Sequence, residues 1–376
     1  MGLNMSLCLF ALLVSFGVSF EQFRPPPDWI NWSGVLDHHL ASSLLPLKEA
    51  AAGRTVLTSL DLGRTKQSVR IGDEGLLTST DSLLVTWDEL KEIADKRSGC
   101  HAIYEDGSKP FRVSTISKNT GIPASLCPPL QSSGPPTMVL GGFTMHRLVD
   151  TNPKDDTAAK INAITSALFP GAKVLDTCCG LGYTACLAAE RVGSAGSVTT
   201  VEYDQASLEM CCYNPHSKAL FDGSLPIRVL QGDACEIIKS FEDNSFNAIC
   251  HDPPARALTR TDVFSLSFYK QLRRVLKPQG TLFHYIGDVK SKESGRLYKG
   301  VIDRLHDAGF ANVKRYDAAF GLVASGSTRR MTSVDEEGGR EGGGKSKEGL
   351  FRRRRSGRER MAATDGEEEE EEPLFL

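Results

Sequence analysis

Residues 151–325 alternate short apolar runs with stretches in which apolar residues recur at helical spacing. A short apolar run between turn residues predicts a buried strand, and a longer amphipathic stretch predicts a surface helix. We expect strands at 173–175, 197–201, 227–230, 246–250, 281–286, 313–316 and 321–324. We expect helices at 157–168, 183–192, 205–213, 235–241, 265–276 and 299–308. This alternation predicts a doubly wound α/β fold around a parallel sheet, with the last two strands forming a hairpin at its edge.

Residues 28–150 have a different pattern, with many Gly, Pro and Ser residues and few long helical repeats. Short strands are expected at 56–57, 68–71, 83–85, 101–104, 111–114 and 137–140. Thr86 followed by Glu89 is a capping-box sequence, which predicts the start of a helix over 87–96. We therefore expect a small strand-rich N-terminal unit ahead of an α/β domain at 151–325.

The two ends of the chain differ from the rest. Residues 1–27 hold an uncharged run from Met5 to Phe20 and end in three prolines, which predicts a targeting leader. A retained anchor and a misassigned start are the alternatives. Residues 326–376 are rich in glycine and charge, including six glutamates at 367–372. Such a segment buries too little apolar surface to offset its ordering entropy, so we expect a disordered tail, with a specific partner site as the alternative.

Composition limits the class of protein. The 376 residues carry a formal net charge of −3, and 40% are hydrophobic and 24% charged. These values are ordinary for a globular protein, and they exclude a wholly disordered chain, a collagen and a polytopic membrane protein. The nearly balanced charge provides no overall attraction to nucleic acid.

The cysteines bear on the compartment. Seven of the ten lie between residues 178 and 250, and the adjacent pairs at 178/179 and 211/212 are not typical of a disulfide framework. None has C-x-x-C spacing, so we expect no structural zinc and no metal site. Free thiols and a leader together favour a reducing organelle interior reached by import, such as that of a plastid, over secretion. We expect no stable membrane insertion unless the leader is retained.

The run from Val174 to Gly182 joins a buried strand to a glycine-containing turn and a helix. Gly180 and Gly182 let the backbone pass close to a ligand, and the helix N-terminus offers free N–H groups. Dinucleotide-binding enzymes carry a third glycine where this chain has Ala185. Asp176 at the strand end suits the amino group of S-adenosylmethionine better than a pyrophosphate. We therefore expect this cofactor to bind at Asp176, Gly180 and Gly182; a plain strand–turn–helix is the alternative.

Two more acidic residues follow the next two strands. Glu202 ends the second strand, 20 residues beyond Gly182, where a carboxylate can accept both ribose hydroxyls. Asp233 follows the third strand, where it can accept from the adenine amino group while the backbone N–H of Ala234 donates to the ring. Because successive parallel strands end at the same sheet edge, the three acids predict one cofactor site.

The fourth strand ends in His251-Asp252-Pro253-Pro254. We expect Asp252 to be catalytic, holding an amine or the methionine portion of the cofactor, and Pro253 and Pro254 to fix a rigid substrate-facing loop. Enzymes that methylate a flipped base place an aromatic residue after the prolines, whereas Ala255 follows here. Nucleic acid is therefore not a favoured substrate.

Three histidines and one arginine complete the candidate site. A neutral imidazole can accept a proton near pH 7, so we expect His146 and His251 to be catalytic and His284 to contact substrate. The alternative for each is a hydrogen-bonded structural residue. Arg147 has a planar fork that suits an anionic or carbonyl group of the substrate.

Residues 55–325 resemble the predicted archaeal-type methyltransferases, a class I S-adenosylmethionine-dependent family. The resemblance rests on Leu60–Gly63, Met145–Arg147, Val174–Ala185, His251–Pro254 and Leu282–Gly287. It implies a Rossmann-like class I fold, with its common hairpin ending, and methyl transfer to an acceptor that these motifs do not identify. Cys179 departs from the family, in which a small hydroxyl residue is more usual.

Two other functions remain as alternatives. An aminopropyltransferase of the spermidine-synthase type is compatible with Glu202 and Asp233, although its first motif is a run of glycines with an Asp inside. A catalytically silent Rossmann scaffold is the second. We expect the methyltransferase, acting on a small molecule or a protein side chain. We also expect residues 28–150 to cover the carboxyl edge of the sheet and to bring His146 and Arg147 opposite Asp252; the alternative is a unit that supports the sheet from behind.

Overall fold

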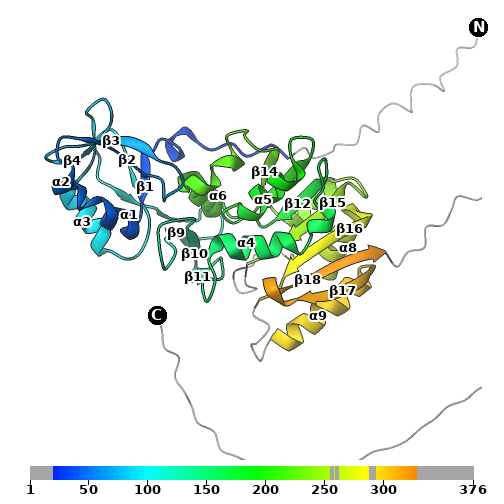
Figure 1. The fold of residues 1–376 in the computed structure, drawn as a ribbon. Coiled ribbons are helices and arrows are strands. Elements are labelled where there is room, and N and C mark those ends of the chain that lie inside the picture. Colours follow the sequence, from blue (N-terminus) through cyan, green and yellow to red (C-terminus); the bar gives the residue numbers. More distant parts are fainter. Residues whose placement is uncertain (1–19, 255–257, 259–261, 288–293, 328–376) are drawn as a thin grey trace, which may run out of the picture. The chain divides into compact units, whose positions relative to one another are not determined.

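A seven-stranded sheet is the largest sheet of the computed structural model and lies on the right in Figure 1. The structure describes residues 20–254, 258, 262–287 and 294–327. In spatial order the strands are β14 (Ile227–Gln231), β13 (Ser197–Glu202), β12 (Lys173–Thr177), β15 (Phe246–His251), β16 (Leu276–Tyr285), β18 (Gly321–Ser327) and β17 (Phe310–Tyr316). The first five are parallel, and β18 is antiparallel to both of its neighbours. The predicted doubly wound, Rossmann-like fold with an edge hairpin is confirmed.

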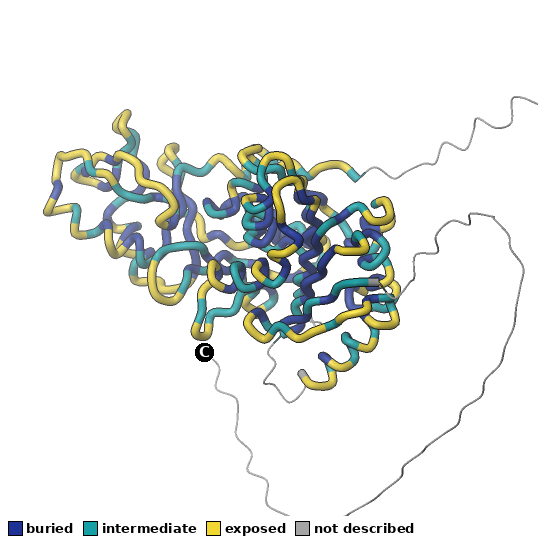
Figure 2. The backbone as a smooth tube through the Cα atoms, turned by 45° about the vertical axis from the view of Figure 1, so that its right-hand side comes forward, coloured by how far each residue is buried: buried dark blue, intermediate teal, exposed yellow. Residues whose placement is uncertain are grey.

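Helices cover both faces of this sheet. One face packs against α4 (Pro153–Asn162), α5 (Tyr183–Val192) and α6 (Gln205–Tyr213), and the other against α7 (Ala234–Ile237), α8 (Leu266–Val275) and α9 (Ser294–Asp307). Alternation along β12 explains the two cores, because Val174 points into the first and Leu175 into the second. Both side chains are fully buried, and Figure 2 shows the central strands as buried.

Several elements begin or end away from their predicted positions. Helix α4 starts at Pro153 instead of 157, because the Asn152 side chain accepts the Asp155 N–H and proline suits the first helical position. Strand β16 starts at Leu276 instead of 281, since Leu276 already pairs with Phe246 of β15. Short 3₁₀ segments occur at Pro27–Trp29, Thr165–Ala167, Pro215–Leu220, Ile238–Ser240 and Asp317–Ala319.

Residues 34–103 contribute a separate hydrophobic core. A four-stranded antiparallel sheet of β2 (Thr55–Thr58), β3 (Gln67–Ile71), β4 (Gly75–Leu77) and β5 (Leu83–Thr86) packs with α1 (His38–Leu44), α2 (Leu47–Ala50) and α3 (Trp87–Asp95). The predicted capping box of α3 is present: the Thr86 hydroxyl accepts the Glu89 N–H, and the Glu89 carboxylate accepts the Thr86 N–H at 2.9 Å. Strands β1 (Gly34–Leu36), β6 (His101–Ile103) and β7 (Phe111–Arg112) form a second small sheet.

The next strands belong to the core of the α/β domain. The four-stranded sheet of β8 (Ser114–Ile116), β9 (Pro123–Cys127), β10 (Thr137–Leu140) and β11 (Phe143–Thr144) contributes Leu126 and Met138 to the core that holds Val174. Thr120, in the β8–β9 turn, donates from its hydroxyl to Asp204 at 2.9 Å, just beyond the end of β13. The hydrophobic core therefore continues across residue 150, and residues from the N-terminal half reach the carboxyl edge of the large sheet.

Both ends of the α/β domain extend beyond their predicted bounds. Strand β18 runs to Ser327, so its last two residues lie in the segment expected to be a disordered tail; residues 328–376 lie outside the described residues. Residues 20–23, predicted to belong to the leader, run beside β14, where the Phe23 N–H donates to the Val229 carbonyl at 2.8 Å. Across the described residues, no helix is long and apolar enough to cross a membrane.

Residues 20–27 are predicted to stabilise the folded chain. Phe23 packs its ring 5.9 Å from that of Phe221, and the Arg228 guanidinium donates to the Phe20 carbonyl. A chain that starts at Asp28 loses the ring contacts of Phe23 with Phe221 and with Trp29, and the hydrogen bonds that join Phe20 and Phe23 to β14. It should therefore be about 2–4 kcal/mol less stable than a chain that starts at Phe20. Urea denaturation of the two proteins measures the difference. Equal midpoints would show that this segment contributes nothing to the fold.

Candidate functional site

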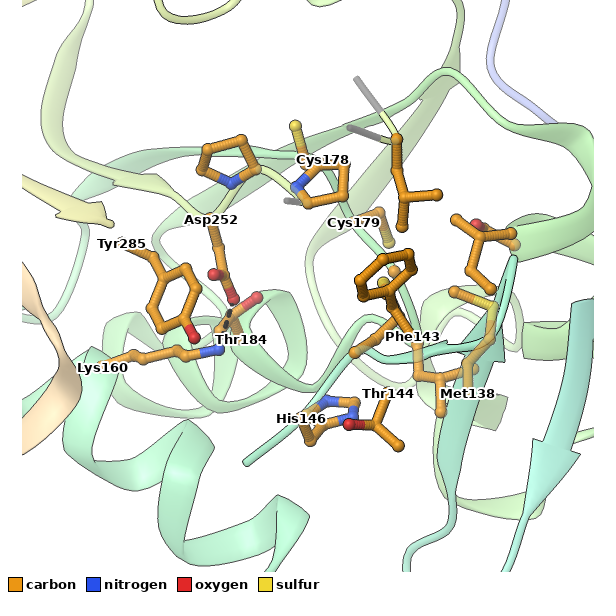
Figure 3. A pocket seen from close by; sticks show the side chains of 18 of the residues that line it. Met138, Phe143, Thr144, His146, Lys160, Cys178, Cys179, Thr184, Asp252 and Tyr285 are labelled. Carbon is orange, nitrogen blue, oxygen red and sulfur yellow. Dashed lines mark hydrogen bonds and ion pairs between the residues drawn. The ribbon is translucent and has the colours of Figure 1, made fainter. Parts of the chain in front are cut away.

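A cavity of about 1000 Å³ opens at the carboxyl edge of the large sheet. Its wall combines the turn after β12 and the ends of β13, β15 and β16 with residues of β10, β11 and α4. Figure 3 shows Lys160, Asp252 and Tyr285 gathered on one side of the cavity, with Met138 and Phe143 farther across it. The N-terminal half of the chain therefore forms part of the wall that holds the candidate residues.

The turn after β12 lies in the cavity wall at Cys178–Leu181. Cys178 has a positive φ of 63°, a conformation that costs a non-glycine residue about 1–3 kcal/mol. The thiol of Cys211 donates to the Gly180 carbonyl at 3.0 Å and helps to hold the turn. Burial raises the pKa of the Cys178 thiol, which therefore stays protonated and poorly nucleophilic.

The two glycines of the turn have different positions. A side chain at Gly180, where φ is +54°, would extend into open space in the cavity. A Cβ at Gly182 would instead lie 2.3 Å from Leu220, so that glycine is required by packing against the neighbouring segment. The structure thus places Gly180 in the cavity wall and Gly182 behind it, at the start of α5.

Asp176 lies beneath the cavity and does not line it. Its carboxylate is buried and accepts the hydroxyls of Thr184, on α5, and Thr200, on β13, at 2.8 and 2.6 Å. These bonds tie together three neighbouring elements. Burial raises the pKa of Asp176 to about 7, because the hydroxyl donors only partly offset the loss of solvation.

Glu202 is buried at the end of β13 and lines the cavity. One carboxylate oxygen accepts the Gly180 N–H at 2.8 Å and the other accepts the Asp204 N–H at 2.9 Å. The side chain thereby joins the ends of β12 and β13. Burial raises its pKa to about 7.

Asp233 is placed differently from its prediction. Its side chain accepts the Cys235 N–H at 2.8 Å as the N-cap of α7, whereas its neighbours Gly232 and Ala234 line the cavity. A cap of this kind accounts for an aspartate at a strand-to-helix turn. The backbone around Asp233, not its carboxylate, therefore borders the cavity.

A buried chain of charges joins α4 to the end of β15. The ammonium of Lys160 lies 2.6 Å from an oxygen of Asp252 and 2.9 Å from an oxygen of Asp156, which also binds Arg147. Burial alone would lower the pKa of Lys160, but the attraction of the two carboxylates outweighs it and raises that pKa, so the ammonium persists. Burial raises the pKa of Asp252 against the opposing attraction of Lys160.

His146 and Arg147 line the same cavity as Asp252. His146 shares a hydrogen bond of 3.0 Å with the Thr137 hydroxyl, and its ring centroid lies 5.2 Å from that of Tyr183. Burial lowers the pKa of His146 to about 3, so the imidazole is neutral at physiological pH. The guanidinium of Arg147 is already engaged by Asp156 and by the Ala318 carbonyl.

The structure does not bring His251 and His284 into the cavity. Both are fully buried under the sheet edge, with ring centroids 4.4 Å apart. His251 accepts from Thr177 at 2.6 Å and donates to the Val263 carbonyl at 3.1 Å, while His284 bonds the Tyr269 hydroxyl at 2.8 Å. This geometry is that of structural histidines, and it does not support the direct roles predicted for them. Pro253 and Pro254 do line the cavity, whereas Ala255 lies outside the described residues.

Sequence reasoning missed Lys160 and Tyr285. Lys160 falls inside the predicted helix 157–168, and its i,i+4 spacing from Asp156 was an available signal of an ion pair. The contact with Asp252, 92 positions away, had no local signal. In the part of the chain that the structure describes, no three His, Cys, Asp or Glu side chains are grouped as a metal would require.

Comparisons with known proteins agree with this architecture. The methyltransferase-domain family matches residues 174–280. An uncharacterized protein of Methanocaldococcus jannaschii is 41% identical over 272 residues, which cover 72% of this chain and 88% of that protein. At this identity and coverage the two chains belong to one family.

Two further similarities are more limited. A demethylmenaquinone methyltransferase of Staphylococcus aureus is 33% identical over 110 residues, 29% of this chain and 41% of that enzyme. The crystal structure of spermidine synthase from Thermotoga maritima overlays with a TM-score of 0.42 at 19% identity, covering 55% of this chain and 70% of that one. An overlay at this level does not identify the reaction.

The buried carboxylate of Asp176 predicts a pH dependence of stability. Its pKa is higher in the folded chain than in the unfolded one, so the folded state binds the additional proton between about pH 4 and pH 7. The free energy of unfolding should therefore fall as pH rises through this window. Asp176→Asn should remove this pH dependence. Between pH 4 and pH 8 its free energy of unfolding should therefore rise by about 2–4 kcal/mol relative to that of the wild type. Urea denaturation at both pH values measures it, and parallel pH profiles for the two proteins would contradict the prediction.

Proposed function

We propose a role for each end of the cavity, starting from the fact that the chain belongs to the class I S-adenosylmethionine-dependent methyltransferases. The cofactor of this family supplies, when bound, a methyl group on a positively charged sulfur. The chain's own residues must then hold the cofactor, exclude water and orient a nucleophile.

The cofactor end consists of Gly180, Glu202 and Ala234. The open space beside Gly180 accommodates a ligand against the backbone. Each carboxylate oxygen of Glu202 accepts one backbone N–H and keeps a lone pair, which suits the two ribose hydroxyls. Ala234 is the first residue of α7, and its backbone N–H has no partner within the helix, which suits a ring nitrogen. Asp176 and Asp233 support this end through the turn and the cap that they stabilise.

The acceptor end consists of Asp252, Lys160 and Tyr285, and the ion pair of Asp252 with Lys160 is the observation that carries the proposal. One Asp252 oxygen contacts Lys160 at 2.6 Å, and the other has no hydrogen-bond partner among the described residues. Asp252 lines the cavity and follows β15, the strand that pairs with β12. Its second oxygen is thus available to accept an N–H or O–H group of an acceptor.

We infer that Asp252 orients the nucleophile and takes up its proton. The bound cofactor would supply the methyl group, whose bond to sulfur would break as the bond to the nucleophile forms, and the neutral thioether would be the leaving group. Lys160 holds the carboxylate in place through its bonds to Asp252 and Asp156. His146 remains neutral and can donate or accept one hydrogen bond from the cavity wall. The acceptor is a small molecule or a protein side chain that carries an N–H or O–H nucleophile.

Glu202 provides the test of the cofactor end. Because its pKa is about 7 in the free protein and the carboxylate form accepts hydroxyls, affinity for S-adenosylmethionine should rise about tenfold from pH 6 to pH 8. Glu202→Gln should bind more weakly at pH 8 by roughly 1–3 kcal/mol and show little pH dependence. Calorimetric titration measures both effects. Glu190→Gln is the control, because Glu190 is exposed and is not among the residues that line the cavity. Wild-type affinity in Glu202→Gln would refute the ribose assignment.

Asp252 provides the test of the acceptor end. Tritiated S-adenosylmethionine is incubated with extracts of small molecules and with protein fractions, and labelled products are counted. Asp252→Asn should lower the labelling rate at least about 100-fold while changing cofactor affinity less than threefold, because its role is on the acceptor side. Asp317→Asn, at an exposed ion pair with Arg315, is the control and should label normally. A loss of cofactor affinity equal to the loss of rate would reassign Asp252 to the cofactor.

A further inference from the structure

The charged groups at the acceptor end neutralise one another. Arg147, Asp156, Lys160 and Asp252 alternate in sign along one chain of contacts, so their formal charges sum to zero. Their side chains are 18%, 0%, 3% and 19% exposed, in that order. Because these side chains are largely shielded from water, each charge is stabilised mainly by its oppositely charged neighbour. The paired charges therefore exert little net attraction on a charged ligand.

The two cations are also covered by aromatic rings. The guanidinium carbon of Arg147 lies 4.4 Å from the centre of the Phe320 ring, and the Lys160 ammonium lies 4.7 Å from that of Tyr285. Both rings line the cavity. A ligand at this end therefore meets ring surface beside the cations, and one carboxylate oxygen of Asp252 as a hydrogen-bond acceptor.

Much of the remaining wall is apolar, and one part of it is open to solvent. It includes Met138, Leu140, Phe143, Met145 and Val149. Phe143 is 49% exposed and Val149 is 85% exposed, although both border the cavity. Apolar side chains that stay exposed around a cavity mark a binding surface. A volume of about 1000 Å³ is at the top of the range for one drug-sized ligand, so the cavity has room for a small second molecule beside a cofactor.

We propose that the acceptor is an uncharged, largely apolar molecule with one N–H or O–H group, and that the cavity discriminates against polyamines and phosphorylated compounds. This inference rests on the proposed function, since it specifies the acceptor of the same site. At the acceptor end, a cation or an anion would lose its hydration without gaining a free counter-charge from the balanced chain Arg147–Asp156–Lys160–Asp252, whereas an uncharged molecule loses little. The single donor group then bonds Asp252 while the apolar body covers Phe143 and the nearby methionines.

Three probes with one naphthalene body separate charge from shape. They are 1-naphthylmethanol, which is uncharged, 1-naphthylmethylammonium and 1-naphthoate. Each is titrated into the full chain saturated with S-adenosylhomocysteine, and binding is followed by calorimetry. The alcohol should bind at least about tenfold more tightly than either ion. Equal binding of all three, or preference for either ion, overturns the proposal.

Matched variants locate the binding surface. Phe143→Ala should weaken binding of the alcohol about five- to tenfold, the effect of losing one aromatic contact. Phe169→Ala is the control, because Phe169 is also 49% exposed and lies outside the described cavity wall. Equal effects of the two variants would place the probe elsewhere and overturn the proposal.

Removal of one cation tests the charge balance itself. Lys160→Met leaves one negative charge in excess, so the folded variant should bind the naphthylmethylammonium ion more tightly than the alcohol. An unchanged preference in a folded variant overturns the proposal; if the variant does not fold, the three-probe titration and the phenylalanine pair decide it. A chain that binds no S-adenosylhomocysteine refutes the cofactor proposal, and the same titrations in the unliganded chain still test the charge preference.

Discussion

The ammonium of Lys160 cannot be taken away from Asp156 and Asp252 without leaving a buried charge unpaired. Breaking a buried ion pair from one side typically costs about 3–5 kcal/mol, far more than an exposed pair contributes. This constraint fixes helix α4 against the end of β15, and through Arg147 it also fixes the segment that leads into α4. The shape of the acceptor end therefore follows from a requirement for charge balance.

The α/β domain could be read from the sequence because its signals are local. Strands such as β12 are short apolar runs, and their order follows from alternation with helices. The three acids at strand ends were found by the same logic, and the structure places all three at the expected edge. Their chemistry differs, however: Glu202 faces the cavity, whereas Asp176 and Asp233 bind hydroxyl and N–H groups of the protein. Spacing alone does not distinguish an acid that meets a ligand from one that holds a turn.

The parts that could not be predicted depend on contacts between distant segments. His251 and His284 end adjacent strands and have suitable chemistry, but their rings are buried inside the protein. There Thr177 and the Val263 carbonyl engage both nitrogens of His251, and Tyr269 engages Nε2 of His284. The reverse holds for Lys160. Nothing in the sequence marks this helical lysine as a cavity residue, but it lines the cavity because α4 packs at the sheet edge. The contribution of β10 and β11 to the wall was expected in outline, because residues 28–150 were predicted to cover the carboxyl edge of the sheet, although Met138 and Phe143 were not singled out.

The side-chain amide of Asn119 bonds the backbone of the segment after β13 in the way that a neighbouring strand would. It donates to the Tyr203 carbonyl at 2.7 Å and accepts the Gln205 N–H at 3.2 Å, so one side chain satisfies both a backbone acceptor and a backbone donor. The segment that it holds begins beside Glu202. A ligand that immobilises Glu202 therefore also suppresses local opening of the β8–β9 turn. It does so through the bonds of Asn119, and the ligand itself need not contact that turn. Protection of backbone amides from solvent exchange can thus spread from the large sheet into the N-terminal half without any change in the average structure.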